Sequence, residues 1–412
     1  MITSLLSVLV LAVSSGDDWP QYNGAGSDRS SRETLGTKSF PKEGPKARWR
    51  IETGAGFSSL AVVGERAYTL VLRDEAEVLV ALDAASGKEL WAAELSEPDY
   101  DGGADAGEDG NDGGDGPRAT PSVADGRVVV FDANLGLHAF DAASGKELWK
   151  QDLKGDFDGQ KLQWNNAASA LLEGGRVYVV GGGAGQALLA FEAATGKLAW
   201  KRGDEKMTHA TPIAATIHGT RQVIFFVQSG LVAVDPASGN ELWRTEFPYR
   251  TSTAASPVVA GDVVFCSAGY GVGAAAWRID QKEGKLVPEL LWRTPNKNIN
   301  HWSTPVVHDG HLYGMFSFKE YGKGPLRCIE LETGAEKWAE AGFGPGNVIL
   351  VGGTLVALSD KGELVLIDPR PDAYQELARA DVLPGKCWSM PAFANGALYL
   401  RSTKESVRID LR

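Results

Sequence analysis

The chain has 412 residues, of which 41 are basic and 53 acidic, so its formal net charge is −12. With 43% hydrophobic residues it can bury a large core, which excludes a disordered chain, and its acidic balance opposes binding to nucleic acid or to an anionic membrane surface. Its three cysteines cannot build a disulfide framework, and its 50 glycines, well above the usual share of about 7%, indicate many tight turns and an all-β fold.

Residues 1–16 contain an apolar run from Leu5 to Val13 that ends in small residues and is followed by two aspartates. This pattern predicts a secretory signal peptide, although its start carries no lysine or arginine. The run is shorter than the roughly 20 apolar residues of a membrane span. We therefore expect an exported protein of the periplasm or cell envelope, with no transmembrane span once the leader is removed; an uncleaved N-terminal anchor is the alternative. Residues 17–45 are then an N-terminal extension.

An internal repeat governs the rest of the chain. The segment ALDAASGKELW at 81–91 recurs almost unchanged at 139–149, 190–200 and 233–243, and weaker copies follow. All copies share an acidic residue, found at Asp83, Asp141, Glu192, Asp235, Asp280, Glu330, Asp368 and Asp410. The mean spacing of about 47 residues suits four short strands per repeat, as in a β-propeller, and solenoid repeats are the alternative.

The interior of each repeat indicates strands. Two or three apolar runs precede the acidic residue, separated by turn pairs such as Asp125-Gly126 and Asn395-Gly396, and no amphipathic helix pattern appears. We therefore expect strands A, B and C, a Ser/Thr-Gly turn with its glycine at positive φ, and an outer strand D. The tryptophan of strand D is expected to pack where neighbouring blades meet.

The two ends of the repeat region complement each other. Asp410 lies two residues from the last residue of the chain, so the eighth repeat has no strand D, whereas residues 47–51 resemble a strand D with no repeat before it. Adding this strand to the last blade removes the open edges of the ring. The predicted fold is all-β: an eight-bladed β-propeller of four-stranded blades over residues 46–412, closed by an N-terminal strand.

The first spacing is the longest and contains an acidic insertion at 96–117, with eight acidic residues and no basic one. Its alternating Asp and Gly suggest a calcium loop, but the ligand spacing of such loops is not met. We expect a solvated, disordered insertion, because a Gly/Asp run buries little surface. Weak calcium binding is the alternative.

The segments that lead into each strand A should converge near the axis of the ring, and they are rich in aromatic and cationic residues. The residues predicted to form an axial pocket are Arg118, Trp164, His209, Arg250, His301, Trp302 and Trp388. A largely apolar surface with a few convergent donors is typical of a site for an anionic or polar ligand. In the alternative, these side chains bond to neighbouring loops and plug the channel.

The A-x-D-x-x-[ST]-G-K-x-x-W repeats, together with Asp18-Trp-Pro-Gln21, resemble the pyrroloquinoline-quinone-binding-like β-propeller repeat family over residues 18–412. This family includes quinoprotein dehydrogenases and the non-catalytic propeller lipoprotein of the outer-membrane β-barrel assembly machinery. The resemblance therefore implies the fold and leaves the function open.

The quinone alternative makes specific demands on the sequence. Quinoprotein alcohol dehydrogenases of this fold typically carry an adjacent Cys-Cys pair and a Glu/Asn/Asp set around calcium, whereas Cys266, Cys328 and Cys387 are isolated and are predicted to be core residues. His308 and His311 flank a turn, but two exposed ligands do not make a metal site.

We therefore predict a monomeric, non-catalytic binding or assembly scaffold with no cofactor, no metal site and no catalytic residues, whose partner is a protein or a small molecule. The alternative is an oxidoreductase that uses pyrroloquinoline quinone with calcium.

Overall fold

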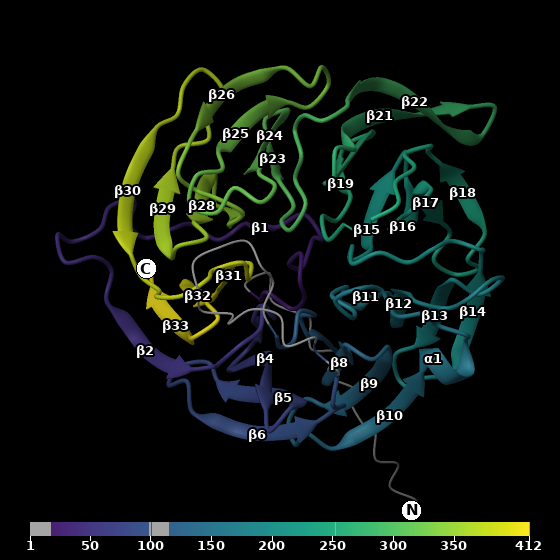
Figure 1. Cartoon of the computed structure of the whole chain (residues 1–412), viewed down its shortest axis with the longest axis horizontal. Helices are drawn as coiled ribbons and strands as arrows, with labels where there is room; N and C mark the ends of the chain where they lie inside the picture. Colours follow the sequence, from purple (N-terminus) through teal and green to yellow (C-terminus); the bar gives the residue numbers. More distant parts are fainter. Residues whose placement is uncertain (1–17, 99, 101–114, 252, 412) are drawn as a thin grey trace, which may run out of the picture.

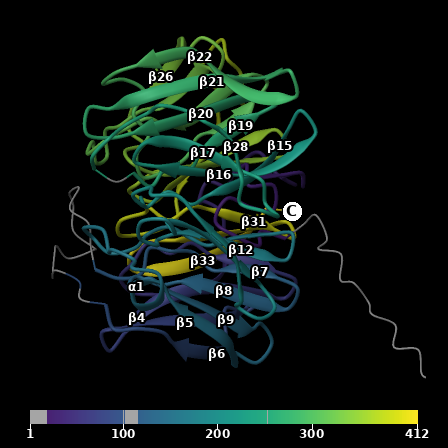
Figure 2. The ribbon, with the colours of Figure 1, turned by 90° about the vertical axis from the view of Figure 1, so that its right-hand side faces the viewer.

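The computed structural model describes residues 18–98, 100, 115–251 and 253–411. The predicted leader and most of the acidic insertion lie outside these described residues. Eight sheets, each built on four antiparallel strands, stand around a central axis (Figure 1), and Figure 2 shows the same ring from its side. The predicted eight-bladed β-propeller is confirmed.

Each blade runs outward from strand A at the axis to strand D at the rim. The first seven blades follow the chain without a break and are built as follows: β3 (Ala61–Val63), β4 (Arg66–Arg73), β5 (Ala76–Asp83) and β6 (Glu89–Glu94); β7 (Ser122–Ala124), β8 (Arg127–Phe131), β9 (Gly136–Asp141) and β10 (Glu147–Asp152); β11 (Leu171–Glu173), β12 (Arg176–Val180), β13 (Leu188–Glu192) and β14 (Leu198–Arg202); β15 (Ile213–Ile217), β16 (Thr220–Val227), β17 (Gly230–Val234) and β18 (Glu241–Arg244); β19 (Val258–Ala260), β20 (Val263–Ala268), β21 (Gly273–Lys282) and β22 (Lys285–Thr294); β23 (Val306–His308), β24 (His311–Met315), β25 (Leu326–Glu330) and β26 (Glu336–Glu340); β27 (Asn347–Val351), β28 (Thr354–Leu358), β29 (Glu363–Ile367) and β30 (Glu376–Asp381).

The eighth blade combines both ends of the chain. It consists of β31 (Ala392–Ala394), β32 (Ala397–Arg401), β33 (Glu405–Asp410) and the N-terminal strand β2 (Ala47–Glu52). Strands β2 and β33 are antiparallel, with Trp49 opposite Arg408, so the predicted ring closure is confirmed. In the part of the chain that the structure describes, the one helix is α1 (Leu153–Asp156), and no helix there is long and apolar enough to cross a membrane.

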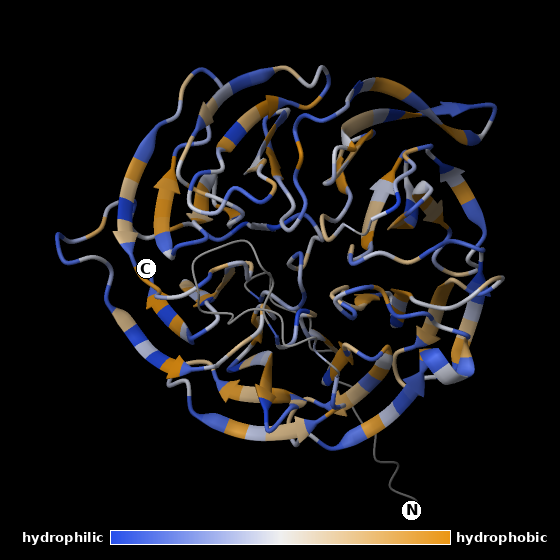
Figure 3. Cartoon of the chain, in the orientation of Figure 1, coloured by the Kyte–Doolittle hydropathy of each residue, from blue (hydrophilic) through white to orange (hydrophobic). Residues whose placement is uncertain are grey.

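Burial follows the position of a strand in its blade. The middle strands are buried on both faces because blades pack face to face, as in β5, whereas outer strands such as β10 carry exposed and half-buried residues. Figure 3 shows the hydropathy of the residues along the same strands. Tight A–B turns keep these strands in register. In the Asp125-Gly126 turn both residues have positive φ, 49° and 72°, as a two-residue hairpin turn requires.

The tryptophan of a strand D docks on the turn glycine of the next blade. Trp91 Nε1 donates to Ala142 O at 3.2 Å, and a Cβ added at Gly145 would lie 2.6 Å from the indole ring. Gly145 therefore supplies both the positive φ of 72° and the room for the ring. The same pairing joins Trp49 to Gly87, Trp149 to Gly196, Trp200 to Gly239 and Trp292 to Gly334.

Trp243 departs from this pattern. Its Nε1 donates to Gln222 Oε1 within its own blade, and at the next turn no atom of the described residues lies within 4 Å of a Cβ added at Gly284. The reason is the length of β21 and β22, ten residues each, which places Gly284 at the tip of a long hairpin. Trp243 is nevertheless buried in a core cluster that includes Trp277 and Ile279 of the next blade, so it packs between blades as predicted but without a turn glycine beneath its ring.

Residues 18–36, which we call the N-terminal strap, cross the centre of the ring (purple in Figure 1). Within it, β1 (Ser30–Ser31) pairs in parallel with β27, and the buried Arg29 donates to Thr304 O at 2.8 Å and to Asn347 Oδ1 at 3.1 Å. Hydrogen bonds join the strap to residues on or beside the inner strands of seven blades: Val62, Val123, Leu172, Ser256, Thr304, Asn347 and Asn395. Because these partners surround the axis, the strap closes one end of the channel.

Replacing Gly145 with Ala should lower the free energy of unfolding more than replacing Gly284. Both substitutions place Ala at positive φ, 72° and 77°, which costs roughly 1 to 2 kcal/mol. Only Gly145→Ala also displaces a docked indole, which adds about 1 to 3 kcal/mol. Urea denaturation measures both losses, and equal losses would contradict the docking role.

Candidate functional site

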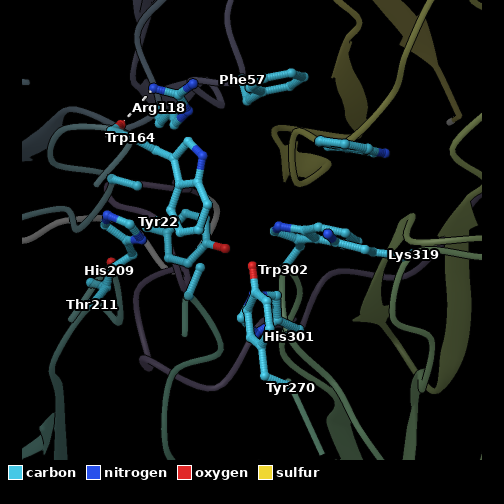
Figure 4. Close-up of a pocket in the computed structure, with 13 residues that line it drawn as sticks. Tyr22, Phe57, Arg118, Trp164, His209, Thr211, Tyr270, His301, Trp302 and Lys319 are labelled. Atoms are coloured by element: carbon cyan, nitrogen blue, oxygen red, sulfur yellow. Dashed lines mark hydrogen bonds between the residues drawn. The ribbon is translucent and has the colours of Figure 1, made fainter. Parts of the chain in front are cut away.

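A cavity lies on the axis of the ring and encloses about 1140 Å³, including its open mouth. Its lining comes mainly from the segments that lead into the inner strands, as the sequence predicts, and Figure 4 shows these side chains around a common open space. The lining residues are Tyr22, Phe57, Arg118, Trp164, Ala167, His209, Thr211, Ala254, Tyr270, His301, Trp302, Lys319 and Trp388.

Six of the seven residues predicted for the axial pocket line this cavity, and Arg250 does not. Tyr249, which precedes Arg250, is buried in the core beside blades 4 and 5, and its N–H donates to Gln228 O at 3.0 Å. This anchoring leaves Arg250 exposed at the surface, while Ala254 of the same segment lines the cavity instead.

Seven further lining residues were not predicted, and three of them, Ala167, Thr211 and Ala254, lie in the same segments as predicted residues. Phe57 precedes β3 as the other residues precede their inner strands, so the same rule would have found it. Tyr270 and Lys319 come from B–C turns, which carry no repeated signal. Tyr22 comes from the N-terminal strap, whose path across the ring is decided by tertiary contacts.

One wall of the cavity is a stack of aromatic rings. Trp302 and Trp388 lie parallel, with centroids 4.9 Å apart and an interplanar angle of 12°. Phe57 covers the stack beside Trp388 at 5.1 Å, and Phe318 lies beside Trp302 at 5.7 Å. The neighbouring rings therefore cover the faces of both indoles, and Trp302 presents its edge to the open space (Figure 4).

The two lining histidines are neutral at physiological pH. Burial lowers the pKa of His209 to about 4, and its Nε2 donates to Asn165 O at 2.7 Å. Burial, with His209 and Lys319 nearby, lowers the pKa of His301 to about 3, and its Nδ1 accepts the Gly269 N–H at 3.2 Å. They are therefore polar groups rather than cations.

The positive charge of the lining belongs to Arg118 and Lys319. Arg118 Nη1 donates to Trp164 O at 2.8 Å, and the exposed Lys319 places its Nζ 5.7 Å from the ring centroid of Tyr270. None of the described lining residues is acidic. The cavity of this acidic protein is thus lined by aromatic rings, neutral imidazoles and two cations.

Backbone strain is concentrated at the same place. Trp164, Tyr270 and Lys319 line the cavity with φ values of 70°, 55° and 55°, a region that costs non-glycine residues roughly 1 kcal/mol or more each. Such strain persists only where surrounding contacts enforce it, and it tends to collect at ligand-binding sites.

A buried acidic network supports Arg118 from behind. Glu77 accepts hydrogen bonds from Tyr100 Oη at 2.7 Å and from the Ala133 N–H at 2.9 Å. Burial, reinforced by nearby Asp132, raises the pKa of Glu77 to about 7. The ring of Tyr100 lies 5.6 Å from the Arg118 guanidinium, so this network helps to orient Arg118 at the cavity.

Replacing Glu77 with Gln should remove a pH-dependent loss of stability. Because the folded-state pKa is raised, folded Glu77 retains a proton that the unfolded chain releases, and stability falls as pH rises from 4.5 towards 7. Glu77→Gln should therefore be more stable than the parent at pH 8, by roughly 2 to 3 kcal/mol, and similar to it at pH 4.5. Urea denaturation at both pH values measures the difference, and Glu75→Gln in the adjacent exposed turn is the control that should leave the profile unchanged.

The two cavity histidines should also keep their charge state between pH 8 and 5. Their lowered pKa values predict that the imidazole NMR signals of His209 and His301 do not move in this range. His138 is the internal contrast: burial alone would lower its pKa, but hydrogen bonds to Asp132 and Glu147 raise it. Titration of His301 near pH 6.5 would show that the cavity holds a third cation.

The lining does not fit a quinone held by calcium. Calcium prefers several carboxylate or carbonyl oxygens, whereas the side-chain oxygens of the described lining are the hydroxyls of Tyr22, Thr211 and Tyr270. Among the described residues no three His, Cys, Asp or Glu side chains gather as a metal site, and the three cysteines are buried and separate.

Comparison with known proteins gives one family. The family described as outer membrane protein assembly factor BamB matches residues 74–340. BamB of Shewanella oneidensis is 24% identical over 268 residues, which cover 61% of this chain and 64% of that protein, so the match spans just under two thirds of this relative. BamB of Burkholderia pseudomallei is 26% identical over 365 residues, covering 78% of this chain and 87% of that protein.

Two solved structures share the architecture. The quinohemoprotein alcohol dehydrogenase of Comamonas testosteroni superposes with a TM-score of 0.66 at 14% identity, covering 97% of this chain and 81% of that one. BamB of Moraxella catarrhalis gives a TM-score of 0.60 at 14% identity, covering 89% and 99%. At this identity the likeness shows the fold alone, and it agrees with the resemblance drawn from the repeats.

Proposed function

The chain belongs to the family of the outer membrane protein assembly factor BamB, and from this membership we propose that it is an exported, non-catalytic scaffold that binds other proteins in the bacterial envelope. The observation that carries the proposal is the family match itself, which runs from the first blade to the end of the sixth. The similar proteins of Shewanella oneidensis and Burkholderia pseudomallei carry the name of this family.

The chemistry of the cavity supports a binding role over a redox role. A quinoprotein-type oxidoreductase needs oxygen ligands for calcium beside its cofactor, and the described lining supplies aromatic rings, neutral imidazoles and two cations instead. The closed ring is also suited to a scaffold, because docked tryptophans join neighbouring blades and hold the surface loops in fixed relative positions.

Depletion of the protein in its native host should lower the amount of folded β-barrel protein in the outer membrane, and a tagged copy should be found in the envelope fraction, crosslinked to outer-membrane assembly proteins. Quantitative immunoblotting of fractionated cells and crosslinking mass spectrometry measure both effects. A copy without residues 1–16 is the matched control and should neither reach the envelope nor restore the β-barrel proteins.

The opposite result is equally specific. If depletion leaves outer-membrane β-barrel proteins unchanged, and the purified chain with pyrroloquinoline quinone and calcium oxidises alcohols, the scaffold proposal is rejected in favour of an oxidoreductase.

A further inference from the structure

The two faces of the ring differ in what covers them. The N-terminal strap lies on the face of the A–B turns, because Gly64 and Gly352 in two of these turns donate their N–H groups to the strap at 2.9 and 3.0 Å. The cavity therefore opens on the opposite face, which carries the B–C turns and the segments that lead into each strand A. We call this the mouth face.

The B–C turns divide the mouth face into a basic and an acidic part. Those of blades 6, 7 and 8 carry exposed lysines, whereas those of blades 1 to 5 contain no lysine or arginine, and the turn of blade 1 consists of the exposed Asp74 and Glu75. The exposed lysines, which we call the lysine crescent, are Lys319, Lys323, Lys361 and Lys404.

The segments that lead into strand A follow the same division. Those beside the crescent, at 295–305, 341–346, 382–391 and 53–60, contain no aspartate or glutamate. Those that lead into blades 2 to 5 carry many acidic residues, among them Glu97, Asp115, Asp156, Asp158, Asp204, Glu205 and Glu246.

The charge of the crescent is largely uncompensated. Among the described residues no ion pair involves its four lysines, whereas arginines of the blades are paired, such as Arg379 with Glu363 at 3.1 Å. Glu320 is the one exposed acidic residue in these B–C turns. The carboxylate of Asp360 is buried, and its Oδ2 accepts the N–H of Gly322 at 2.8 Å.

The crescent is continuous from blade to blade. Lys361 of blade 7 lies against the turn of blade 6, since a Cβ added at Gly322 would be 2.7 Å from its Nζ. Lys404 of blade 8 lies against Gly385, whose added Cβ would be 3.3 Å from the Lys404 Cδ. Gly385 belongs to the segment 382–391, which is bonded to the B–C turn of blade 7 at 2.9 Å. The four cations therefore border one surface.

Aromatic rings flank these lysines. Lys319 Nζ lies 5.7 Å from the ring centroids of Tyr270 and Phe318, and Lys361 Nζ lies 5.4 Å from that of Tyr321. Tyr270 is 41% exposed, and both Tyr270 and Lys319 have a φ of 55°, a strain that tends to collect at binding sites. The other large apolar side chains of similar exposure lie on outer strands: Leu90, Leu148, Leu198 and Leu290.

We propose that the lysine crescent is a docking surface for an acidic segment of a partner protein. Carboxylates of the segment would lie along the four lysines, and its apolar side chains against the exposed ring of Tyr270. Lys323, Lys361 and Lys404 do not line the axial cavity, so this surface is separate from that cavity. The inference adds a binding surface to the proposed scaffold function and rests on that function for the choice of a protein as partner.

The divided mouth face favours a flexible segment over other anionic partners. An anionic bilayer that meets the crescent also approaches Asp74, Glu75 and the acidic segments of the other part, which repel it. The net charge of −12 likewise opposes a nucleic acid. A polypeptide segment can follow the crescent without crossing the acidic part.

Two capped peptides test the inference by isothermal titration calorimetry on the chain that begins at residue 17. They are acetyl-Glu-Glu-Tyr-Glu-Glu-Gly-Tyr-Glu-Glu-amide and the same peptide with glutamine at every glutamate. At about 20 mM salt the acidic peptide should bind at least about tenfold more tightly than the neutral one. Its affinity should fall about tenfold at roughly 300 mM salt, because exposed charges are screened.

Paired substitutions assign the binding to the crescent. The double variant Lys323→Gln with Lys361→Gln should weaken the acidic peptide by about five- to tenfold. The matched control is Lys88→Gln with Lys146→Gln, which changes the net charge equally at exposed C–D turns of the opposite face and should alter binding by less than about twofold. Melting temperatures close to the parent value should show that both variants retain the fold.

Four results overturn the inference. They are equal binding of the acidic and neutral peptides, equal losses in the two double variants, tighter binding of phosphatidylglycerol vesicles or of a deoxythymidine dodecamer than of the acidic peptide, and binding of the peptide only after residues 101–114 are replaced by a short Gly-Ser linker. The last result would make the chain's own acidic insertion the occupant. None of them bears on envelope localisation or on the crosslinks to assembly proteins, so failure of this inference is distinguishable from failure of the scaffold proposal.

Discussion

The structure depends on an indole ring that reaches from one blade onto a glycine of the next. Trp91 does so over Gly145, with its Nε1 bonded to the carbonyl of Ala142. The acidic residue of the motif shapes the turn that receives it, because Asp141 accepts the backbone N–H and the hydroxyl of Ser144. The motif therefore encodes a donor and a receptor in one segment, and repetition of that segment sets the position of each blade relative to the last.

A ring built this way must still be closed, and both ends of the chain contribute. The pairing of β2 with β33 supplies the missing outer strand, while the buried Arg401 donates from the last blade to the carbonyls of Ser58 and Leu70 in the first. Burial lowers the pKa of Arg401 to about 9. The hydrogen-bond acceptors of its guanidinium are these backbone carbonyls and the hydroxyl of Thr69. The strap then crosses the axis and converts a channel into a cavity with one mouth.

The character of that cavity differs from that of the protein as a whole. The chain carries a net charge of −12, yet the described lining contains Arg118 and Lys319 and no acidic residue. Burial keeps His209 and His301 neutral. Glu77 lies behind the lining, where it accepts a hydrogen bond from Tyr100. The scaffold role does not by itself account for the aromatic and cationic lining of the cavity.

The sequence by itself determined the architecture, because its signals are local and repeated. An eleven-residue motif and its weaker copies specify the blade count, the positive-φ glycines and the closing strand, and all of these are present in the structure. The same regularity located six of the seven predicted pocket residues, since segments before inner strands must converge.

Tertiary structure alone decided the features that the repeats do not specify. Arg250 is turned outward because Tyr249 beside it is buried. Trp243 has no turn glycine beneath its ring because β21 and β22 extend past the usual turn. Tyr22 reaches the cavity only because the strap binds seven blades at once. Each depends on contacts between residues far apart in the chain, and no local pattern records them.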